Sequence, residues 1–379
     1  MRLFTLIRHV HVYRPEDLGV KDILTCNDKI VEIGDNLDYA LPNLSCIDGT
    51  GMLAFPGYID QHVHVTGGGG EGSFKTRVPE LKLSDCIKAG VTTVVGLLGT
   101  DGITRSVENL VAKTKGLNEE GITAYCLTGS YEYPTKTLTG DVKKDIAFIQ
   151  EVLGVKIAIS DHRSSHITKQ ELTRLASDVR QASLISGKPG IIVFHLGREK
   201  EQLNLIFEVL KDTEIPIKHF RPTHAQKVFD QALEFAELGG YVDFTAGDGP
   251  KSADPILKAL RSGADPSRFT ISTDSNGSMP RWNEKNEMIG LTAAVMTTLH
   301  GTIRSMITEH GVDIPTAISF GTKNVAKALE IDDRKGSLDA GRDADILLLD
   351  EQLNIRTVMA KGKLMMHQSE IKVKGTFED

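Results

Sequence analysis

The chain has 379 residues, of which 40% are hydrophobic and 25% are charged, and its formal net charge is -7 at pH 7. This globular composition suits one large domain with a smaller one, and the mild acidic excess argues against nucleic acids and membrane surfaces as electrostatic partners. Four scattered cysteines without a CxxC pair indicate reduced thiols, so we expect neither a disulfide framework nor a thiolate zinc site. Because the sequence shows no signal-peptide cleavage site and no apolar run long enough to span a bilayer, we predict a cytoplasmic protein.

The two ends of the chain share one pattern. Residues 1–54 contain short alternating strands such as DKIVEIG, separated by turn residues, and residues 335–379 contain ADILLLD and IRTVMAKGKLMM. Neither end follows the rhythm of the middle of the chain. We therefore predict that both termini together form one small β domain, a β-sandwich.

Between the ends, residues 55–334 alternate apolar runs with amphipathic helical patterns. Several runs, including GIIVFHL and VKIAIS, are continuous, as expected of parallel strands that are covered on both faces. Glycine often follows the helical patterns, as in TKQELTRLASDVRQASLISG, where a left-handed cap ends a helix. About eight such units predict a (β/α)8 TIM barrel. A doubly wound open sheet is the alternative, although it would usually need fewer units.

The tripeptide His-Val-His occurs twice, and in a strand its two imidazoles would face the same side. His9 and His11 lie in a terminal strand without other candidate ligands nearby, so we interpret them as surface histidines of an edge strand. His62 and His64 come at the end of the first barrel strand, directly before a glycine-rich loop. Active sites of TIM barrels lie at that end of the strands, so this pair is the candidate metal site.

Four later strands carry further candidates. Lys156 opens VKIAIS, His195 closes GIIVFH, His224 closes IKHFRPTH, and Asp274 closes FTISTD. Taken singly, each has an ordinary explanation as a hydrogen-bonded or capping residue. Taken together with His62 and His64, they come from five strands and could converge on one mouth of the barrel.

Lys156 is the unusual member of this set. An ammonium group within an apolar strand is costly to bury, and desolvation favours the neutral amine. Either the side chain reaches water, or the amine has reacted with carbon dioxide. The resulting carbamate would be an anionic ligand with two oxygens, able to bridge two metal ions.

The glycine run also fits another motif. Gly67, Gly69 and Gly72 satisfy GxGxxG after a strand, which could mark a dinucleotide site. However, EGSFKTRVPE does not open a helix at once, and no acidic residue ends the next strand, VTTVVGLLGT. We expect instead that the glycines let backbone amides approach a small substrate.

Over nearly its whole length the sequence resembles the amidohydrolase superfamily and, within it, the isoaspartyl dipeptidase (β-aspartyl peptidase) family. The resemblance is carried by PGYIDQHVHVTGGGGEG, AGVTTVVGLLGTD, LTGSYEYPTKTLTG, GVKIAISDHRSS, FHLG, PTH, STDSNGS, KGKLMM and VKGTFE. It implies a site for two metal ions, most often zinc. In that site His62 and His64 bind one ion with Asp274, His195 and His224 bind the other, and carboxylated Lys156 and a hydroxide bridge them.

The resemblance also implies the substrate contacts, which fall on Gly69, Glu71, Thr100, Tyr131, Arg163 and Ser278. One position departs from the family pattern, because PTHAQK offers Lys227 where an arginine is expected. Lysine keeps the charge but loses the planar, two-pronged donor geometry. The likeness further implies a homo-oligomer, an octamer, although nothing in the surface pattern indicates one.

These residues predict the hydrolysis of isoaspartyl dipeptides to aspartate and an amino acid. The metal-bridging hydroxide would attack the carbonyl, Asp274 would carry its proton to the leaving nitrogen, and Tyr131 would donate a hydrogen bond to the oxyanion. Glu71 could meet an ammonium group, and Arg163 and Lys227 could meet carboxylates, which suits a small zwitterion with charges at both ends.

Three alternatives remain open from the sequence. The chain could be another amidohydrolase that cleaves a cyclic amide or an N-acyl amino acid. It could be a nicotinamide-binding oxidoreductase, if the glycine motif is a dinucleotide site. It could also be a non-catalytic assembly protein that has kept the barrel, against which the intact set of candidate ligands argues.

Overall fold

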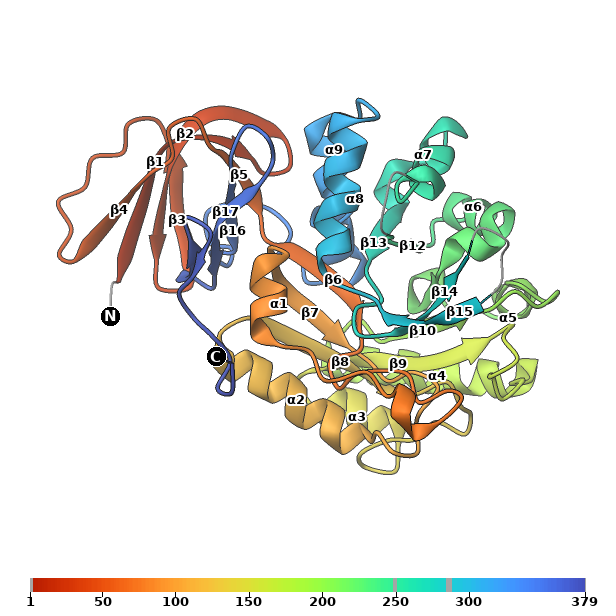
Figure 1. The fold of residues 1–379 in the computed structure, drawn as a ribbon. Coiled ribbons are helices and arrows are strands. Elements are labelled where there is room, and N and C mark those ends of the chain that lie inside the picture. The colour runs from red at the N-terminus through yellow and green to blue at the C-terminus, as the bar shows by residue number, and fades with distance from the viewer. Residues whose placement is uncertain (1–2, 248–250, 284–287, 379) are drawn as a thin grey trace.

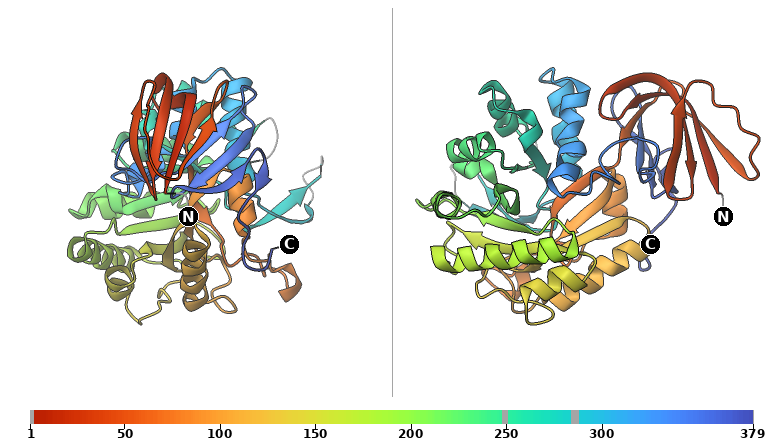
Figure 2. Two further views of the ribbon diagram at one scale, coloured as in Figure 1. Left: turned by 90° about the vertical axis from the view of Figure 1, so that its left-hand side faces the viewer. Right: turned by 180° about the vertical axis from the view of Figure 1, so that it is seen from behind.

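The computed structural model describes residues 3–247, 251–283 and 288–378. It consists of a β-sheet built from both ends of the chain and a larger α/β part built from the middle (Figure 1). The red N-terminal and blue C-terminal strands lie side by side in all three views (Figures 1 and 2).

The terminal sheet contains nine strands in the order β19-β18-β17-β16-β5-β1-β2-β3, with β4 beside β1. Strand β5 joins the two ends, because it runs parallel to β1 and antiparallel to β16. The strands are β1 (Phe4–Tyr13), β2 (Asp17–Cys26), β3 (Lys29–Gly34), β4 (Leu44–Asp48), β5 (Leu53–Pro56), β16 (Ile346–Leu349), β17 (Ile355–Ala360), β18 (Lys363–His367) and β19 (Glu370–Ile371).

The α/β part is of the TIM-barrel type and is built on eight strands whose recorded pairings are all parallel. Six strands form one ladder in the order β11-β10-β9-β8-β7-β6, and two form a second ladder, β12-β13. A parallel bridge between Val63 and Ser275 links the end of β6 to the residues that follow β13. The strands are β6 (Tyr58–Val63), β7 (Val91–Gly96), β8 (Thr123–Gly129), β9 (Val152–Ile159), β10 (Ile191–Leu196), β11 (Phe220–Thr223), β12 (Val242–Thr245) and β13 (Phe269–Ser272).

Most of these strands are buried along their whole length, which explains their continuous apolar runs. Helices cover the outer face of the sheet (Figures 1 and 2). The helices are α1 (Leu83–Lys88), α2 (Val107–Glu120), α3 (Val142–Phe148), α4 (Lys169–Ser186), α5 (Asn204–Asp212), α6 (Phe229–Glu237), α7 (Asp254–Arg261), α8 (Thr297–Thr308), α9 (Ile314–Ser319) and α10 (Lys323–Ala328).

Local sequence signals fix these helices, as α4 illustrates. Thr168 and Glu171 form a reciprocal capping box at its start, and Gly187 ends it in the left-handed conformation. Four short 3-10 helices connect other elements: η1 (Phe74–Thr76), η2 (Ile217–His219), η3 (Ala225–Val228) and η4 (Pro266–Arg268).

Two predicted strands are shorter than the sequence suggests. The run FPGYIDQHV divides at Gly57, so Phe55 and Pro56 belong to β5 of the terminal sheet, two residues beyond the predicted boundary at 54. A side chain at Gly57 would put its Cβ 2.2 Å from Oγ1 of Thr92, so only glycine fits where the chain passes from one sheet to the other. The run IKHFRPTH begins as η2 and becomes a strand only at Phe220.

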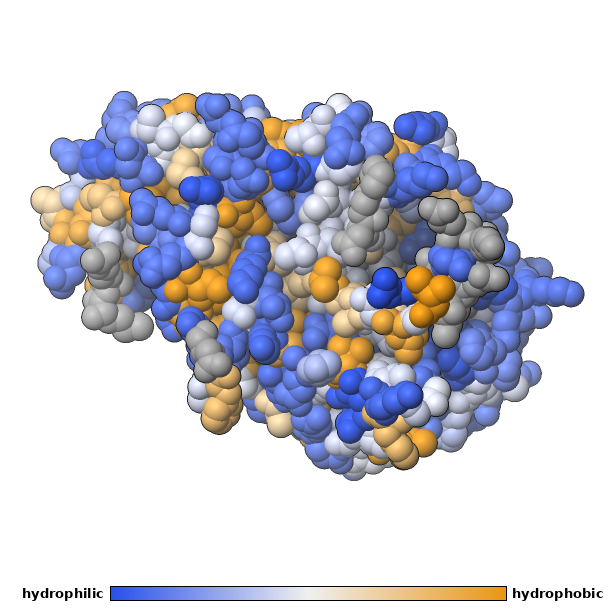
Figure 3. Space-filling view, in the orientation of Figure 1, coloured by the Kyte–Doolittle hydropathy of each residue, from blue (hydrophilic) through white to orange (hydrophobic). Residues whose placement is uncertain are grey.

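After β13 the chain forms an antiparallel hairpin of β14 (Ser278–Trp282) and β15 (Met288–Ala293). Its first residue lies four positions after Asp274 in the sequence, so the base of the hairpin borders the end of β13 (Figure 1). Hydrophilic residues cover most of the face seen in Figure 3, with hydrophobic residues in separate patches between them. Within the described residues, no helix is both long and apolar enough to cross a bilayer.

Candidate active site

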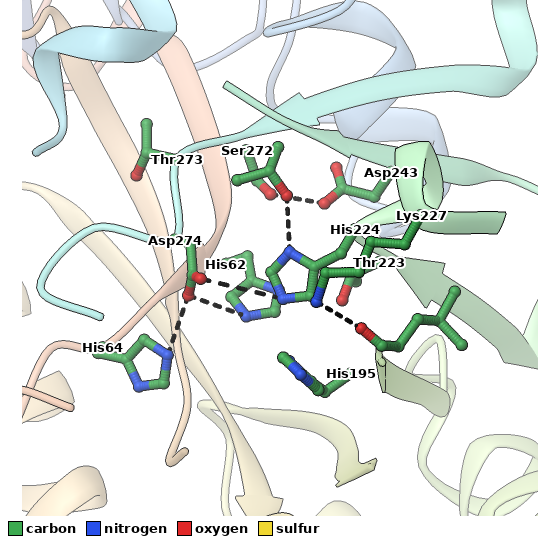
Figure 4. A network of polar contacts seen from close by, with 12 residues as sticks. His62, His64, His195, Thr223, His224, Lys227, Asp243, Ser272, Thr273 and Asp274 are labelled. Carbon is green, nitrogen blue, oxygen red and sulfur yellow. Dashed lines mark hydrogen bonds and ion pairs between the residues drawn. The ribbon is translucent and has the colours of Figure 1, made fainter. Parts of the chain in front are cut away.

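The candidate metal ligands meet at the carboxyl ends of the parallel strands (Figure 4). His62 and His195 lie within β6 and β10, His64 directly follows β6, and His224 directly follows β11. Lys156 lies deeper, in the middle of β9 and not at its end. His224 and Asp274 have φ angles of 58° and 56°. Residues other than glycine rarely adopt this left-handed conformation, and it often marks functional sites.

Asp274 is the centre of the cluster. Its Oδ1 lies 3.0 Å from Nε2 of His64 and 3.4 Å from Nε2 of His62, and its Oδ2 lies 3.9 Å from Nε2 of His224. One potential ligand atom from each of His62, His224 and Asp274 lies within 4.8 Å of the others. Burial opposes ionisation of Asp274, but the hydrogen bond with His64 and the nearby His224 and Lys156 hold its pKa down to about 2.

Lys156 is completely buried, and its Nζ lies 3.0 Å from Nε2 of His62. Burial lowers the pKa of this amine to about 7, as expected of a cation removed from water. Among the residues that the structure describes, no carboxylate forms an ion pair with Lys156. The amine is therefore enclosed with the histidine cluster and lacks a direct counter-ion.

His195 adjoins the cluster but points its ring nitrogens elsewhere. Its ring centroid is 4.6 Å from that of His224. Nδ1 lies 2.6 Å from the hydroxyl of Tyr131, and Nε2 lies 3.1 Å from Oδ2 of Asp161. Burial raises the pKa of Tyr131 well above its ordinary value, so this phenol keeps its proton and can donate it to a hydrogen bond.

The cluster fits a divalent cation. Burial lowers the pKa of His62, His195 and His224 well below the ordinary value, so these imidazoles are neutral at neutral pH and able to coordinate a metal. Nε2 of His224 is buried without a hydrogen-bond partner in the described structure. Buried polar atoms are nearly always satisfied, so an unpaired imidazole nitrogen beside a carboxylate and further imidazoles fits a site that can hold a metal ion.

The predicted substrate residues Glu71, Thr100 and Arg163 form one chain of contacts. Nη1 of Arg163 lies 2.7 Å from Oε1 of Glu71, which also accepts a hydrogen bond of 2.7 Å from Oγ1 of Thr100. Glu71 and Arg163 therefore contact each other, whereas the sequence-based prediction had them meet opposite ends of a substrate. Both groups keep partial exposure, with 36% and 25% of their side-chain surface accessible.

Three other predicted contacts take different positions. Lys227, in η3, donates a hydrogen bond of 2.6 Å to the carbonyl oxygen of Leu196, and burial lowers its pKa to about 8. Gly69 has a φ of 79°, and a Cβ there would lie 2.4 Å from the carbonyl oxygen of Thr76. This glycine thus permits two stretches of backbone to approach each other. Ser278 opens β14 and is partly exposed.

His9 and His11 lie far from this cluster in the fold, within β1 of the terminal sheet. His11 stacks on Tyr13 and contacts Asp17 at 2.6 Å, so its partners are local. The structure therefore places only the second His-Val-His in the candidate site.

Sequence reasoning missed several polar residues that support the cluster. The buried carboxylate of Asp60 accepts hydrogen bonds from the backbone N–H groups of His62 and Thr273, both at 3.2 Å. Thr245 lies 2.6 Å from Nδ1 of His224 through its hydroxyl. Asp161 contacts both Arg163 and His195. For Asp60 and Asp161 the available signal was an acidic residue inside or just after an apolar strand, in YIDQHV and AISDHR.

A model of the amidohydrolase family matches residues 53–365. The chain belongs to the amidohydrolase family. The members of this family are generally hydrolases with binuclear metal sites, which agrees with the His/Asp cluster of the structure.

Among solved structures, a β-aspartyl dipeptidase of Fervidobacterium islandicum AW-1, crystallised with β-Asp-Leu, is 41% identical, with a TM-score of 0.94 over 100% of both chains. This confirms the predicted likeness to the isoaspartyl dipeptidases within the amidohydrolases. A dihydropyrimidinase of Brevibacillus agri shares only the fold, with 14% identity and a TM-score of 0.68 over 98% of this chain and 97% of that one.

Curated relatives are more distant. A dihydroorotase of Elusimicrobium minutum is 25% identical over 95% of this chain and 90% of its own length. An adenine deaminase of Staphylothermus marinus is 23% identical over 87% of this chain. The chain spans about half of that deaminase, 51% of its length.

Proposed function

We propose that this amidohydrolase is a metal-dependent dipeptidase that hydrolyses β-aspartyl dipeptides to aspartate and a second amino acid. The contact between Glu71 and Arg163, next to the histidine cluster, carries the proposal. In a β-linked aspartyl residue, the free ammonium and the free carboxylate sit on the same carbon atom. A carboxylate and a guanidinium that lie 2.7 Å apart complement such a pair of adjacent charges.

The likeness to a β-aspartyl dipeptidase at 41% identity supports the same assignment. Glu71 would bind the α-ammonium group and Arg163 the α-carboxylate. Thr100, which donates to Glu71, would hold that carboxylate in place. Lys227, Gly69 and Ser278 would complete the mouth, with Lys227 offering a second positive charge to the C-terminal carboxylate of the dipeptide.

We infer that His62, His64, His195, His224, Asp274 and a carboxylated Lys156 would hold two divalent ions, zinc by family resemblance. When bound, such ions lower the pKa of water and polarise the scissile carbonyl. The enclosed position of Lys156 beside His62, without a direct counter-ion among the described residues, supports its modification. A carbamate there would remove the cost of burying an ammonium group.

The remaining chemistry falls to side chains of this chain. A carboxylate oxygen of Asp274 would accept the proton of the attacking water. Asp274 would then pass this proton to the departing nitrogen. Tyr131 would donate its hydroxyl hydrogen to the oxygen of the carbonyl under attack, a contact that is typically worth about 3 kcal/mol. The proximity of its hydroxyl to His195 supports a place for Tyr131 inside the site.

We also infer that the eight parallel strands act as one closed (β/α)8 barrel. Contacts between β11 and β12 and between β13 and β6 support closure at the two seams where the ladders stop. The β-sandwich at the termini, the homo-oligomer and the cytoplasmic location stay predictions from the sequence.

Steady-state hydrolysis of β-Asp-Leu, α-Asp-Leu and a cyclic amide by metal-replete protein tests the proposal. We expect turnover of β-Asp-Leu alone, because only this substrate carries its free ammonium and its aspartyl carboxylate on the same carbon atom. Equal turnover of the α-linked isomer would refute the assignment of Glu71 and Arg163. Preference for the cyclic amide, which has no ammonium group, would favour another amidohydrolase activity.

A further inference from the structure

One carboxylate that the sequence did not place in the site contacts both a candidate metal ligand, His195, and a candidate substrate-binding residue, Arg163. Asp161 lies two residues after β9 and is 4% exposed. Its Oδ1 accepts hydrogen bonds from the backbone N–H and from Nε of Arg163, at 2.9 and 2.8 Å. Its Oδ2 accepts a hydrogen bond of 2.8 Å from Nη2 of Arg163 and lies 3.1 Å from Nε2 of His195.

The contact with Asp161 influences which nitrogen of His195 carries the proton. Two unprotonated acceptors would repel each other at 3.1 Å, so the carboxylate of Asp161 favours a hydrogen on Nε2. Nη2 of Arg163 is also 3.0 Å from Nε2; one of its two hydrogens is directed to Oδ2 of Asp161, and the other would favour an unprotonated Nε2. In the neutral imidazole protonated at Nε2, Nδ1 keeps its lone pair and can accept the hydroxyl hydrogen of Tyr131, which lies 2.6 Å away.

A glycine directly after β10 leaves room for the loop that carries Asp161. A Cβ on Gly197, two residues after His195, would lie 2.2 Å from the carbonyl oxygen of Ser160 and 2.5 Å from Cα of Asp161. Any larger residue at 197 would displace the loop that carries Asp161. The glycine of the FHLG motif thus lets this loop lie directly against the end of β10.

The same carboxylate orients Arg163. With Nε and Nη2 held by Asp161, the guanidinium presents Nη1 to Glu71 at 2.7 Å. Because the guanidinium is planar, the two hydrogen bonds at Nε and Nη2 also fix the direction of Nη1.

We propose that Asp161 is a positioning residue that fixes His195 in the tautomer able to bind a metal through Nδ1 and, at the same time, holds Arg163 toward the substrate. For Arg163 the inference rests on the function proposed above, whereas for His195 it needs only a metal. Carboxylates that accept the second N–H of a ligating histidine typically contribute about 10- to 100-fold to metal affinity or activity.

The test compares Asp161→Asn with Arg163→Met and with a matched control, Asp145→Asn. Asp145, in α3, is also a buried carboxylate, but it accepts hydrogen bonds from Thr128 of β8 and from Thr139. Metal-free protein is titrated with Zn²⁺ against a chromophoric chelator, and KM and kcat for β-Asp-Leu are measured on the zinc-loaded forms. Thermal unfolding is recorded for all variants.

We expect Asp161→Asn to weaken one of two zinc equivalents by about 10- to 100-fold and to raise KM about 10-fold or more. Arg163→Met should raise KM while both zinc equivalents keep their affinity. Asp145→Asn should lower only the unfolding temperature. Wild-type affinity for both zinc ions in Asp161→Asn would overturn the proposal, and this result is independent of whether the chain cleaves β-Asp-Leu.

A second measurement serves if Asp161→Asn does not fold. In metal-free wild-type protein with ¹⁵N-labelled histidine, the ring signals of His195 are assigned by comparison with His195→Gln. We expect the tautomer protonated at Nε2. The tautomer protonated at Nδ1 would overturn the role of Asp161.

Discussion

Nζ of Lys156 lies 3.0 Å from Nε2 of His62, with both side chains buried in a cluster of candidate metal ligands. The amine has no direct counter-ion among the described residues, and a carbamate with bound metal would replace the buried ammonium group by a ligand. Lys156→Ala should therefore lose metal and activity together, by at least 100-fold in kcat. Metal content and hydrolysis of β-Asp-Leu measure both.

Short carboxylic acids should partly restore the Lys156→Ala variant, since they can occupy the space of the carbamate. Lys188→Ala is the control, because Lys188 donates to backbone carbonyls of Ile149 and Val152 near the start of β9. Full activity of Lys156→Ala without such acids would show that no bridging group comes from this residue.

Asp274→Asn should reduce kcat for β-Asp-Leu by about 100-fold or more, because an amide cannot accept the proton that the mechanism requires. At least one metal ion should remain bound, since the histidines are unchanged. Metal analysis and steady-state kinetics on the same sample provide the check. Near-normal turnover would remove Asp274 from proton transfer.

Lys227→Arg should lower KM for β-Asp-Leu several-fold, because guanidinium offers two parallel donors to a carboxylate where an ammonium offers a point charge. The lysine amine now donates to the carbonyl oxygen of Leu196, at the end of β10. Lys218→Arg is the control, since Lys218 pairs with Glu330 on the exterior. An unchanged KM in Lys227→Arg would place residue 227 outside the substrate site.

Asp243 predicts a pH dependence of stability. Burial raises its pKa from 3.8 to about 6, although hydrogen bonds from Ser272, Gln61 and Thr270 oppose the shift. Between these pH values the folded chain holds more protons than the unfolded chain. Its free energy of unfolding should therefore fall, as the pH rises, by about 1.4 kcal/mol per unit from this group.

Asp243→Asn removes that contribution, so its stability relative to wild type should increase from about pH 4 to 6 and then stay level. Urea unfolding midpoints of metal-free wild-type and variant protein across this range measure the difference. Parallel pH profiles of the two proteins would contradict a raised pKa at Asp243.

The sequence predicts those features of the site that depend on the regular spacing of residues along strands. His62 and His64 are two residues apart at a strand end, and His195, His224 and Asp274 occupy equivalent places, so their convergence follows from parallel strands. Contacts between loops do not follow from periodicity. The Glu71–Arg163 pair joins loops after β6 and β9, and its geometry depends on how both loops fold.

Two further features needed the three-dimensional structure. Asp161 looks in sequence like a turn residue after a strand, and only its distance to His195 gives it a second partner. Gly57 interrupts a run that reads as one strand, because Thr92 from another strand leaves no room for a side chain. Both depend on neighbours distant in the chain, which a local pattern does not encode.

The most direct test is anomalous diffraction from crystals of the zinc-loaded protein. The account predicts two metal peaks about 3.5–4 Å apart, one beside His62, His64 and Asp274 and one beside His195 and His224, with extra density on Lys156. Crystals of active protein with no metal peak within coordinating distance of these side chains would contradict it.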